Sequence, residues 1–221
     1  MTLLDAAKAG DQAEVQRLLA AGAKIHALDC FLRTPLHHAS NRGHPEVVLE
    51  LLSGGAEINA TNNVGSTPLH EASYGGHPEV VRLLLSGGAE LVARNCWGLT
   101  PLHEACYGSH LEVVRELLSG AAEIDARDSL SRTPLHFASK NGHPEVVVEL
   151  LSRGAEKDAR NNTGSTPLHD ACLWGHSEIV SELILRGASR FIKNDYGKTP
   201  VELTNNPELR ALFAPAVKSA I

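Results

Sequence analysis

The sequence predicts a mainly α-helical repeat solenoid, built from stacked helix-turn-helix units that are joined by short β-hairpin fingers. The tetrapeptide Thr-Pro-Leu-His recurs at a fixed interval of 33 residues, and a decayed copy follows at Thr199. A second histidine, a β-branched pair and, in most copies, a leucine pair recur at the same interval. A unit this short cannot bury its own apolar face, so copies must stack against one another. The five complete copies begin at Thr34, Thr67, Thr100, Thr133 and Thr166.

The repeat interval predicts that residues 1–221 form a single repeat domain. Residues 1–33 are expected to form an N-terminal capping repeat with helices over 3–8 and 13–19 and a polar outer side, because a terminal repeat faces water. Residues 199–213 are expected to form a truncated C-terminal cap with one clear helix and a short one over 207–213, followed by a tail over 214–221. The polar residues of the first cap are Asp5, Lys8, Gln12 and Gln16. The full repeats span 34–66, 67–99, 100–132, 133–165 and 166–198.

Each repeat opens with signals for a first helix. The hydroxyl of Thr34 can cap the helix, and Pro35 suits its first position because an N–H group there would have no partner within the helix. Leu36 and Ala39 are expected to face inward, and the small alanine, present in every repeat, lets neighbouring helices approach closely. Gly43 then ends the helix.

A second helix is expected to begin at Pro45 and to bury one apolar stripe. Gly55 closes this helix, and residues 57–65 should form a hairpin finger with a tight turn near Asn63 and Gly65. The stripe consists of Val47, Val48, Leu51 and Leu52.

Four positions depart from the glycine pattern of the repeats. Ser109 and Ala121 stand where the other repeats have the glycines that end the two helices, and Leu32 and Ser131 replace a glycine of the finger turn. If Ser109 and Ala121 keep a positive φ, each substitution costs about 1 kcal/mol. Because both of these helix-ending glycines are lost in one repeat, we expect a local soft spot around residues 100–125. The fingers with Leu32 and Ser131 are expected to have altered tips.

Length and composition exclude several classes of protein. The chain has 221 residues, of which 43% are hydrophobic, and a net charge of −6, so it can bury a core and is not disordered. No apolar run is long enough for a membrane span, and the first residues lack the apolar core of a signal peptide. The basic residues are fewer than the acidic ones and do not cluster, which argues against a nucleic-acid partner. We expect a monomeric intracellular protein, in the cytoplasm or nucleus, with reduced thiols and no membrane attachment.

The residue types that carry catalysis or bind metals recur here as parts of the repeat. Ten of the 12 histidines occupy two fixed repeat positions, and only His26 and His38 do not, so we expect the ten to make local hydrogen bonds that hold the first helix to neighbouring loops. Equivalent positions in adjacent repeats lie about 10 Å apart, too far to share one zinc ion. No phosphate-binding loop, nucleophile elbow or zinc-protease motif is present. We therefore expect no catalytic residue, no metal and no cofactor.

The four cysteines are expected to remain unpaired. Cys30 and Cys96 share one repeat position, as do Cys106 and Cys172, and each pair is separated by two repeats, roughly 20 Å, which no disulfide can bridge. The first pair should lie at finger tips, where a thiol is open to reaction, whereas the second replaces a small serine packed in the first helix.

The motifs together resemble the ankyrin repeat, over essentially the whole chain. They are Thr-Pro-Leu-His, Ala, Gly-His, Glu-Val-Val, Leu-Leu and Gly-Ala in this order and at this period. The resemblance implies fingers roughly perpendicular to the helices, and a concave groove lined by the finger tips and the exposed face of each first helix. It also implies a protein-recognition module rather than an enzyme.

Positions that differ between repeats are free for a partner, so we predict a binding site among the finger tips and first helices. Seven of the nine aromatic residues lie at finger tips or on first helices. Exposed aromatics beside charges are typical of binding hot spots. We expect a protein or peptide partner with apolar or aromatic anchors and a basic residue that meets Glu71 and Glu104. The predicted contact residues are Phe31, Arg33, Arg42, Glu71, Tyr74, Trp97, Leu99, Glu104, Tyr107, Leu130, Arg132, Phe137, Lys140, Asp170, Leu173 and Trp174.

Two alternatives to a simple recognition module remain open. The chain could be an adaptor or regulatory subunit that positions an enzyme, for example in ubiquitination or phosphatase targeting, or it could be an engineered binding scaffold. The family is also a substrate class for an asparaginyl hydroxylase that modifies an Asn after a Leu, five residues, an acidic residue and an aliphatic one. Leu51, Glu57, Ile58 and Asn59 fit that pattern, so Asn59 is a candidate modification site.

Overall fold

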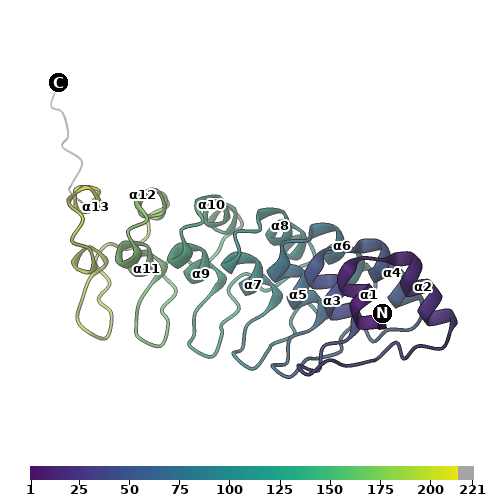
Figure 1. The fold of residues 1–221 in the computed structure, drawn as a ribbon. Helices are drawn as coiled ribbons and strands as arrows, with labels where there is room; N and C mark the ends of the chain where they lie inside the picture. The colour runs from purple at the N-terminus through teal and green to yellow at the C-terminus, as the bar shows by residue number, and fades with distance from the viewer. Residues whose placement is uncertain (214–221) are drawn as a thin grey trace. The chain divides into compact units, whose positions relative to one another are not determined.

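The computed structural model describes residues 1–213, so the predicted tail over 214–221 lies outside the described residues. Within residues 1–213 there are thirteen α-helices, one 3-10 helix and no β-strand (Figure 1). The predicted helical repeat solenoid is therefore confirmed. The chain divides into two compact units, unit 1 (residues 1–123) and unit 2 (residues 124–221). The division into one repeat domain stays a prediction.

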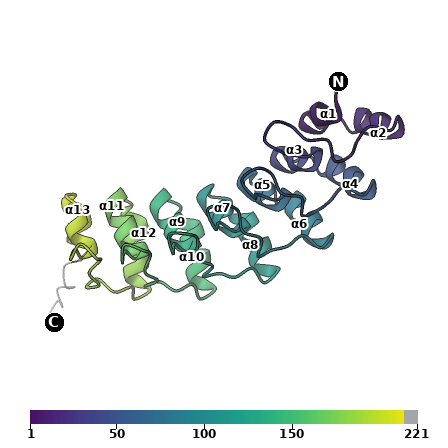
Figure 2. The same ribbon diagram turned by 90° about the horizontal axis from the view of Figure 1, so that it is seen from below.

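Unit 1 consists of two rows of helices. The first helices of successive repeats pack on one another, as do the second helices, and Figures 1 and 2 show the two rows. The first row contains α1 (Leu3–Ala9), α3 (Pro35–Arg42), α5 (Pro68–Gly75) and α7 (Pro101–Tyr107). The second row contains α2 (Gln12–Ala20), α4 (Pro45–Ser53), α6 (Pro78–Ser86) and α8 (Leu111–Ser119).

Unit 2 repeats the same arrangement with fewer elements. Its helices are α9 (Pro134–Asn141), α10 (Pro144–Ser152), α11 (Pro167–Trp174), α12 (Ser177–Leu185), the 3-10 helix η1 (Pro200–Leu203) and α13 (Pro207–Ala211). The first helix of the predicted C-terminal cap is thus a single 3-10 turn, and its second helix ends earlier than the predicted residue 213. η1 packs on α11, and α13 packs on α12.

The Thr-Pro-Leu-His motif starts each first helix as predicted. The Thr34 hydroxyl accepts a hydrogen bond from the N–H of His37, and Pro35 occupies the first turn. Gly43 ends α3 with φ of 72°, in the left-handed region that favours glycine. Leu36 and Ala39 are fully buried, and so are the leucines and alanines at the equivalent positions of the other full repeats. The core therefore continues from repeat to repeat within each unit.

The predicted fingers are present as tight turns without strands in the described part of the chain. In one finger the N–H of Asn62 donates to the carbonyl of Ser66 across 3.0 Å, and the N–H of Gly65 donates to the carbonyl of Asn62 across 3.0 Å. Neighbouring fingers are joined at their tips, where the N–H of Asn63 donates to the carbonyl of Phe31 across 3.0 Å. An isolated bond of this kind does not form the ladder that defines a β-sheet.

All four departures from the glycine pattern keep a positive φ, so the backbone of the finger tips at Leu32 and Ser131 is not altered, contrary to the expectation. Leu32, Ser109, Ala121 and Ser131 have φ values of 58°, 64°, 67° and 57°, and they are the only non-glycine residues with positive φ among the described residues. An L-residue pays a steric cost in this region because its Cβ approaches the following carbonyl oxygen.

Candidate protein-binding surface

Two histidine positions of the repeat connect its first helix to loops on both sides. His37 Nδ1 accepts the N–H of Thr34, and its Nε2 lies 3.0 Å from the carbonyl of Ser66, the residue directly before the next repeat. His77 Nε2 lies 2.9 Å from the carbonyl of Asn41 in the preceding repeat. Burial lowers the pKa of His37 to about 4, so the imidazole is neutral at pH 7. The predicted structural role of the repeated histidines is confirmed at these positions.

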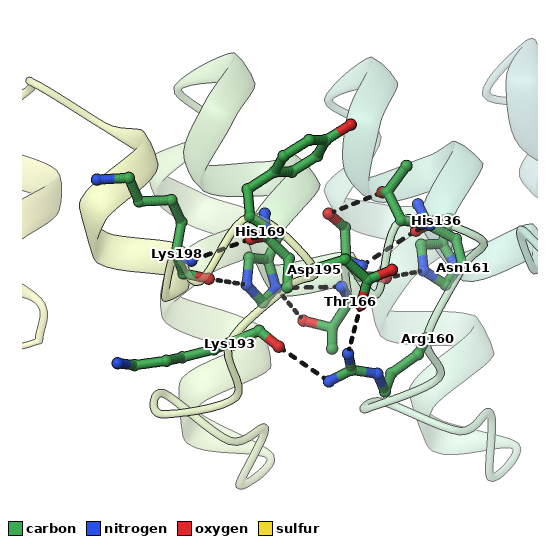
Figure 3. Close-up of polar contacts among 12 residues, drawn as sticks. His136, Arg160, Asn161, Thr166, His169, Lys193, Asp195 and Lys198 are labelled. Atoms are coloured by element: carbon green, nitrogen blue, oxygen red, sulfur yellow. Dashed lines mark hydrogen bonds and ion pairs between the residues drawn. The ribbon is translucent and has the colours of Figure 1, made fainter.

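Figure 3 shows the same connections in unit 2. His169 Nε2 lies 3.0 Å from the carbonyl of Lys198, and its Nδ1 lies 2.9 Å from the hydroxyl of Thr166. Beside them, Arg160 reaches the next finger, where it donates to the carbonyl of Lys193 across 3.0 Å and to Asp195 across 3.2 Å. These bonds hold successive fingers in a fixed arrangement within the unit.

An aspartate or asparagine organises every finger tip, and sequence reasoning missed it. Asn95 Oδ1 accepts the N–H groups of Trp97 and Leu99, both across 3.1 Å, which closes the turn and fixes the direction of the tip residue. The recurrence of Asp or Asn at the 33-residue interval could have revealed it. The equivalent residues are Asp29, Asn62, Asn95, Asp128, Asn161 and Asn194.

In unit 1, asparagines orient two carboxylates that lie one repeat apart. Glu71 on α5 accepts hydrogen bonds from Asn41 across 2.9 Å and from Asn62 across 3.2 Å, and Glu104 on α7 accepts one from Asn95 across 3.3 Å. No Lys or Arg in the described part of the chain forms an ion pair with either carboxylate.

Burial raises the pKa values of both carboxyl groups, and the charge of Glu71 adds to the rise at Glu104. The pKa of Glu104 rises to about 7, first because the group is desolvated and second because Glu71 is negatively charged nearby. Desolvation also raises the pKa of Glu71, although the charge of Arg33 opposes the rise. Two partly buried acids without an ion pair are a costly arrangement in the unbound protein.

On the same two helices, a tyrosine follows each glutamate by about one turn, and the two tyrosine rings stack on each other. The rings of Tyr74 on α5 and Tyr107 on α7 are 6.3 Å apart between centroids and are inclined by 18°. About half of each side chain is exposed. Residues three apart on a helix are surface neighbours, so each tyrosine lies beside the glutamate of its own helix. We call Glu71, Glu104, Tyr74 and Tyr107 the acidic patch.

In unit 2 the corresponding positions combine cations with aromatic rings. The guanidinium of Arg132 forms an ion pair with Asp128 across 2.6 Å and lies 4.5 Å from the ring centre of Phe137. The Lys140 ammonium lies 5.4 Å from the ring centre of Trp174. Desolvation raises the pKa of Asp170 to about 7, although the charges of Lys140 and Arg132 oppose the rise.

The structure corrects the expected exposure of one predicted contact residue on the first helices. Phe137 is only 8% exposed because Arg132 covers its ring. The remaining predicted contact residues are accessible to solvent to different degrees. Those that are exposed are Phe31, Arg42, Tyr74, Trp97, Tyr107, Leu130, Leu173 and Trp174. Those that are half-buried are Arg33, Glu71, Leu99, Glu104, Arg132, Lys140 and Asp170.

The cysteines lie where the repeat pattern predicts. Cys30 and Cys96 are free and exposed at finger tips, whereas Cys106 and Cys172 are free and buried in first helices. Burial raises the pKa of Cys172 to about 12 and that of Cys106 further. Among residues 1–213, no cluster of three or more His, Cys, Asp or Glu is arranged to hold a metal ion.

Asn59, the candidate modification site, connects two fingers. Its Oδ1 accepts the N–H of Glu90 across 3.0 Å, and the side chain is half-buried. Asp125 makes the same bond to Glu156 in unit 2, across 2.9 Å. The Asn59 side chain therefore has a structural role of its own.

Comparisons with known proteins agree with the repeat architecture. A family model described as ankyrin repeats in three copies matches residues 3–95 and 90–161, and one described as ankyrin repeats in many copies matches residues 155–203. The chain belongs to the ankyrin repeat family. No curated protein matches the sequence. The crystal structure of the human ASB11 ankyrin repeat domain is similar, with 28% sequence identity and a TM-score of 0.90 over 97% of this chain and 99% of that one.

Ankyrin repeats are protein–protein interaction modules, and the family is one of non-catalytic scaffolds. In this ankyrin repeat protein, the finger tips and first helices carry the residues that differ between repeats. None of the helices in residues 1–213 has the length and apolar character needed to cross a membrane.

Proposed function

We propose that this chain is a non-catalytic recognition module that binds a protein or peptide through the finger tips and first helices of its repeats, as a monomer. The observation that carries the proposal is the acidic patch, in which two carboxylates without a cation lie beside two stacked, half-exposed tyrosines. The partner supplies a basic residue for Glu71 and Glu104 and apolar or aromatic anchors for the tyrosines and Trp97.

The energetics favour a cationic partner. In the unbound chain the two carboxyl groups are partly desolvated and repel each other, which raises the pKa of Glu104. A bound cation removes this repulsion while its own desolvation is offset by two nearby negative charges. The aromatic rings bury a large area at a small entropic cost, as binding hot spots do.

Affinity capture from a cell extract with paired variants tests the proposal. Trp97→Ala with Tyr107→Ala removes two half-exposed aromatic side chains, and Glu71→Lys with Glu104→Lys reverses the charge of the patch. A matched control is Leu49→Ala with Val92→Ala, since both residues are exposed in unit 1 but lie outside the predicted contacts. We expect the same protein to be lost from both test variants and kept by the control. Recovery of that protein by all variants contradicts the proposal.

We also propose Asn59 as a hydroxylation site, because its side chain occupies the finger position that the family pattern specifies. Intact-mass analysis after treatment with an asparaginyl hydroxylase should show the gain of one oxygen atom, which Asn59→Ala abolishes. An oxygen gained equally by the variant contradicts the assignment to Asn59.

A further inference from the structure

We infer that the basic residue bound by the acidic patch is an arginine, whose guanidinium pairs with Glu71 and Glu104 and stacks on a tyrosine ring. This inference rests on the proposed function, because it specifies the chemistry of the partner at the same site. Three features of unit 1 support it: the orientation of the carboxylates, the position of the tyrosines, and the contrast with other fingers of the chain.

The carboxylates are held in place before a partner arrives. Glu71 receives one amide on each oxygen, from Asn41 and Asn62, and the Oε1 of Glu104 receives the amide of Asn95. The Oε2 of Glu104 accepts no hydrogen bond from the described residues. Each carboxylate oxygen has two lone pairs, so both groups can accept further donors. A guanidinium presents five N–H donors in one plane, so it can donate to two carboxylates at once. An ammonium has three donors on one compact group and is less suited to bridge two carboxylates.

The tyrosines favour the same choice. Tyr74 and Tyr107 are inclined to each other by only 18°, so they present two nearly parallel rings, each three residues after a glutamate of the patch. A planar guanidinium stacks on an aromatic face and remains able to donate hydrogen bonds at its edge. An ammonium is more strongly hydrated and gains less from this combination.

The chain itself combines an acid, an arginine and an aromatic ring in the first finger of the same unit, at other positions of the repeat. In the first finger Arg33 forms an ion pair with Asp29 across 2.8 Å and lies 5.0 Å from the ring centre of Phe31. Arg33 is thereby engaged, and it does not form an ion pair with Glu71. The positions equivalent to Arg33 in the next two fingers are Ser66 and Leu99.

The same combination recurs in unit 2, where Arg132 joins Asp128 to the ring of Phe137. Beside the acidic patch the equivalent tip positions hold Asn62 and Asn95, and the acid and the aromatic ring lie instead on the first helix, where no arginine of the described residues forms an ion pair with the acid. An arginine of the partner completes the set.

Selection from a phage-displayed library of random peptides tests the inference on binders that the chain itself chooses. We expect the selected peptides to share an arginine next to an aromatic or aliphatic residue. The tightest peptide is then synthesised with Arg and with Lys at that position, and both forms are titrated by calorimetry. We expect the Lys form to bind about tenfold more weakly, because a bidentate, stacked contact is lost while the charge is kept.

Variants of the chain assign that difference to the patch. Glu71→Gln with Glu104→Gln should abolish the preference for Arg, and Tyr74→Leu should reduce it while Tyr74→Phe keeps it. The matched control is Glu46→Gln with Glu79→Gln, which removes two exposed carboxylates that are also one repeat apart but lie on second helices. Circular dichroism and thermal unfolding verify that each variant is folded.

The outcomes separate the inference from the proposed function. Peptides whose Arg and Lys forms bind equally, but which depend on both glutamates, overturn the inference and leave the proposed function standing. Peptides that bind independently of Glu71, Glu104 and Tyr74, or a selection that yields no binder, contradict both.

Discussion

Asn95 donates its side-chain amide to Glu104 across 3.3 Å, and this contact links the finger tip of one repeat to the first helix of the next. Asn62 and Glu71 are linked in the same way across 3.2 Å. Where the tip residue is an aspartate, as at Asp29, its carboxylate instead forms an ion pair with an arginine four residues later in the chain. Tip and helix residues therefore vary together, and in these repeats an asparagine at the tip accompanies an acid on the helix that has no cation.

This pairing predicts the effect of changing the tip residue. Asn95→Asp places a second carboxylate against Glu104, so we expect a loss of about 1–3 kcal/mol of stability at pH 8, where both groups tend to ionise. Adding Leu99→Arg should restore most of the loss, because the pair then matches Asp29 and Arg33. Urea unfolding at pH 8 measures both variants, with Leu99→Arg alone as the control. An equal effect of Leu99→Arg with and without Asn95→Asp contradicts the pairing.

The raised pKa of Glu104 predicts that stability depends on pH. Its pKa is about 7 in the folded chain against an ordinary 4.5, so the folded state binds more protons between these values. The stability from this group is complete below pH 4.5 and is lost as the pH rises through 7. Glu104→Gln removes the titration, so we expect it to raise the free energy of unfolding at pH 8 by roughly 1–3 kcal/mol and to change little at pH 4.

Thermal unfolding at the two pH values checks this expectation. Glu79→Gln is the control, since it removes one exposed carboxylate on α6 and changes the net charge equally. The same increase for both variants, or an increase at pH 4, indicates that overall charge rather than Glu104 is responsible.

The strained conformation of Ala121 predicts a stabilising substitution to glycine. Its φ is 67°, and the equivalent residues Gly55, Gly88 and Gly154 have φ of 88°, 90° and 92°. Ala121→Gly relieves the steric cost but adds freedom to the unfolded chain, so we expect a net gain of about 0.5–1 kcal/mol. Ala122→Gly, at a residue without positive φ, should instead destabilise.

Amide hydrogen exchange measures the local consequence. We expect amides over residues 100–125 to exchange faster than those of neighbouring repeats, and Ala121→Gly to slow them. Exchange in this segment that is no faster than in its neighbours contradicts the expected soft spot.

The sequence was sufficient to predict what is repeated. The spacing of Thr34, Pro35 and Gly43 located the first helix, because capping, a fixed φ and a left-handed residue act within a few positions of the chain. The same local reasoning identified Leu32 and Ser131 as replacements of a recurring turn glycine, but the altered tips expected there did not follow, because both residues keep the positive φ of the glycine. These features depend little on contacts with distant residues.

Contacts between side chains of different elements could not be predicted in this way. The burial of Phe137 depends on where the guanidinium of Arg132 lies, and the pKa of Glu104 depends on Glu71 one repeat away. The ordering of each tip by an aspartate or asparagine was visible as a recurrence, but its hydrogen bonds became apparent only with the turn geometry.

A buried position of the first helix predicts a last difference between repeats. Ser40, Ser73 and Ser139 are fully buried there, and their hydroxyl groups have no hydrogen-bond partner among the described residues, whereas Cys106 and Cys172 occupy the same position in the other two full repeats. A buried hydroxyl without a partner costs free energy, while a thiol behaves as a small apolar group. Ser73→Cys should therefore stabilise the chain by about 1 kcal/mol, and Cys106→Ser should destabilise it by a similar amount.

Urea unfolding under reducing conditions measures the pair, with Ser53→Cys as an exposed control that should have little effect. The site accepts a sulfur atom without strain, because Cys106 is 0% exposed and Cys172 is 1% exposed in equivalent surroundings. A neutral Ser73→Cys together with a neutral Cys106→Ser would mean that the hydroxyl bonds back to a carbonyl of its own helix. Opposite signs for the two variants show instead that the cysteines relieve a cost that the three serines retain.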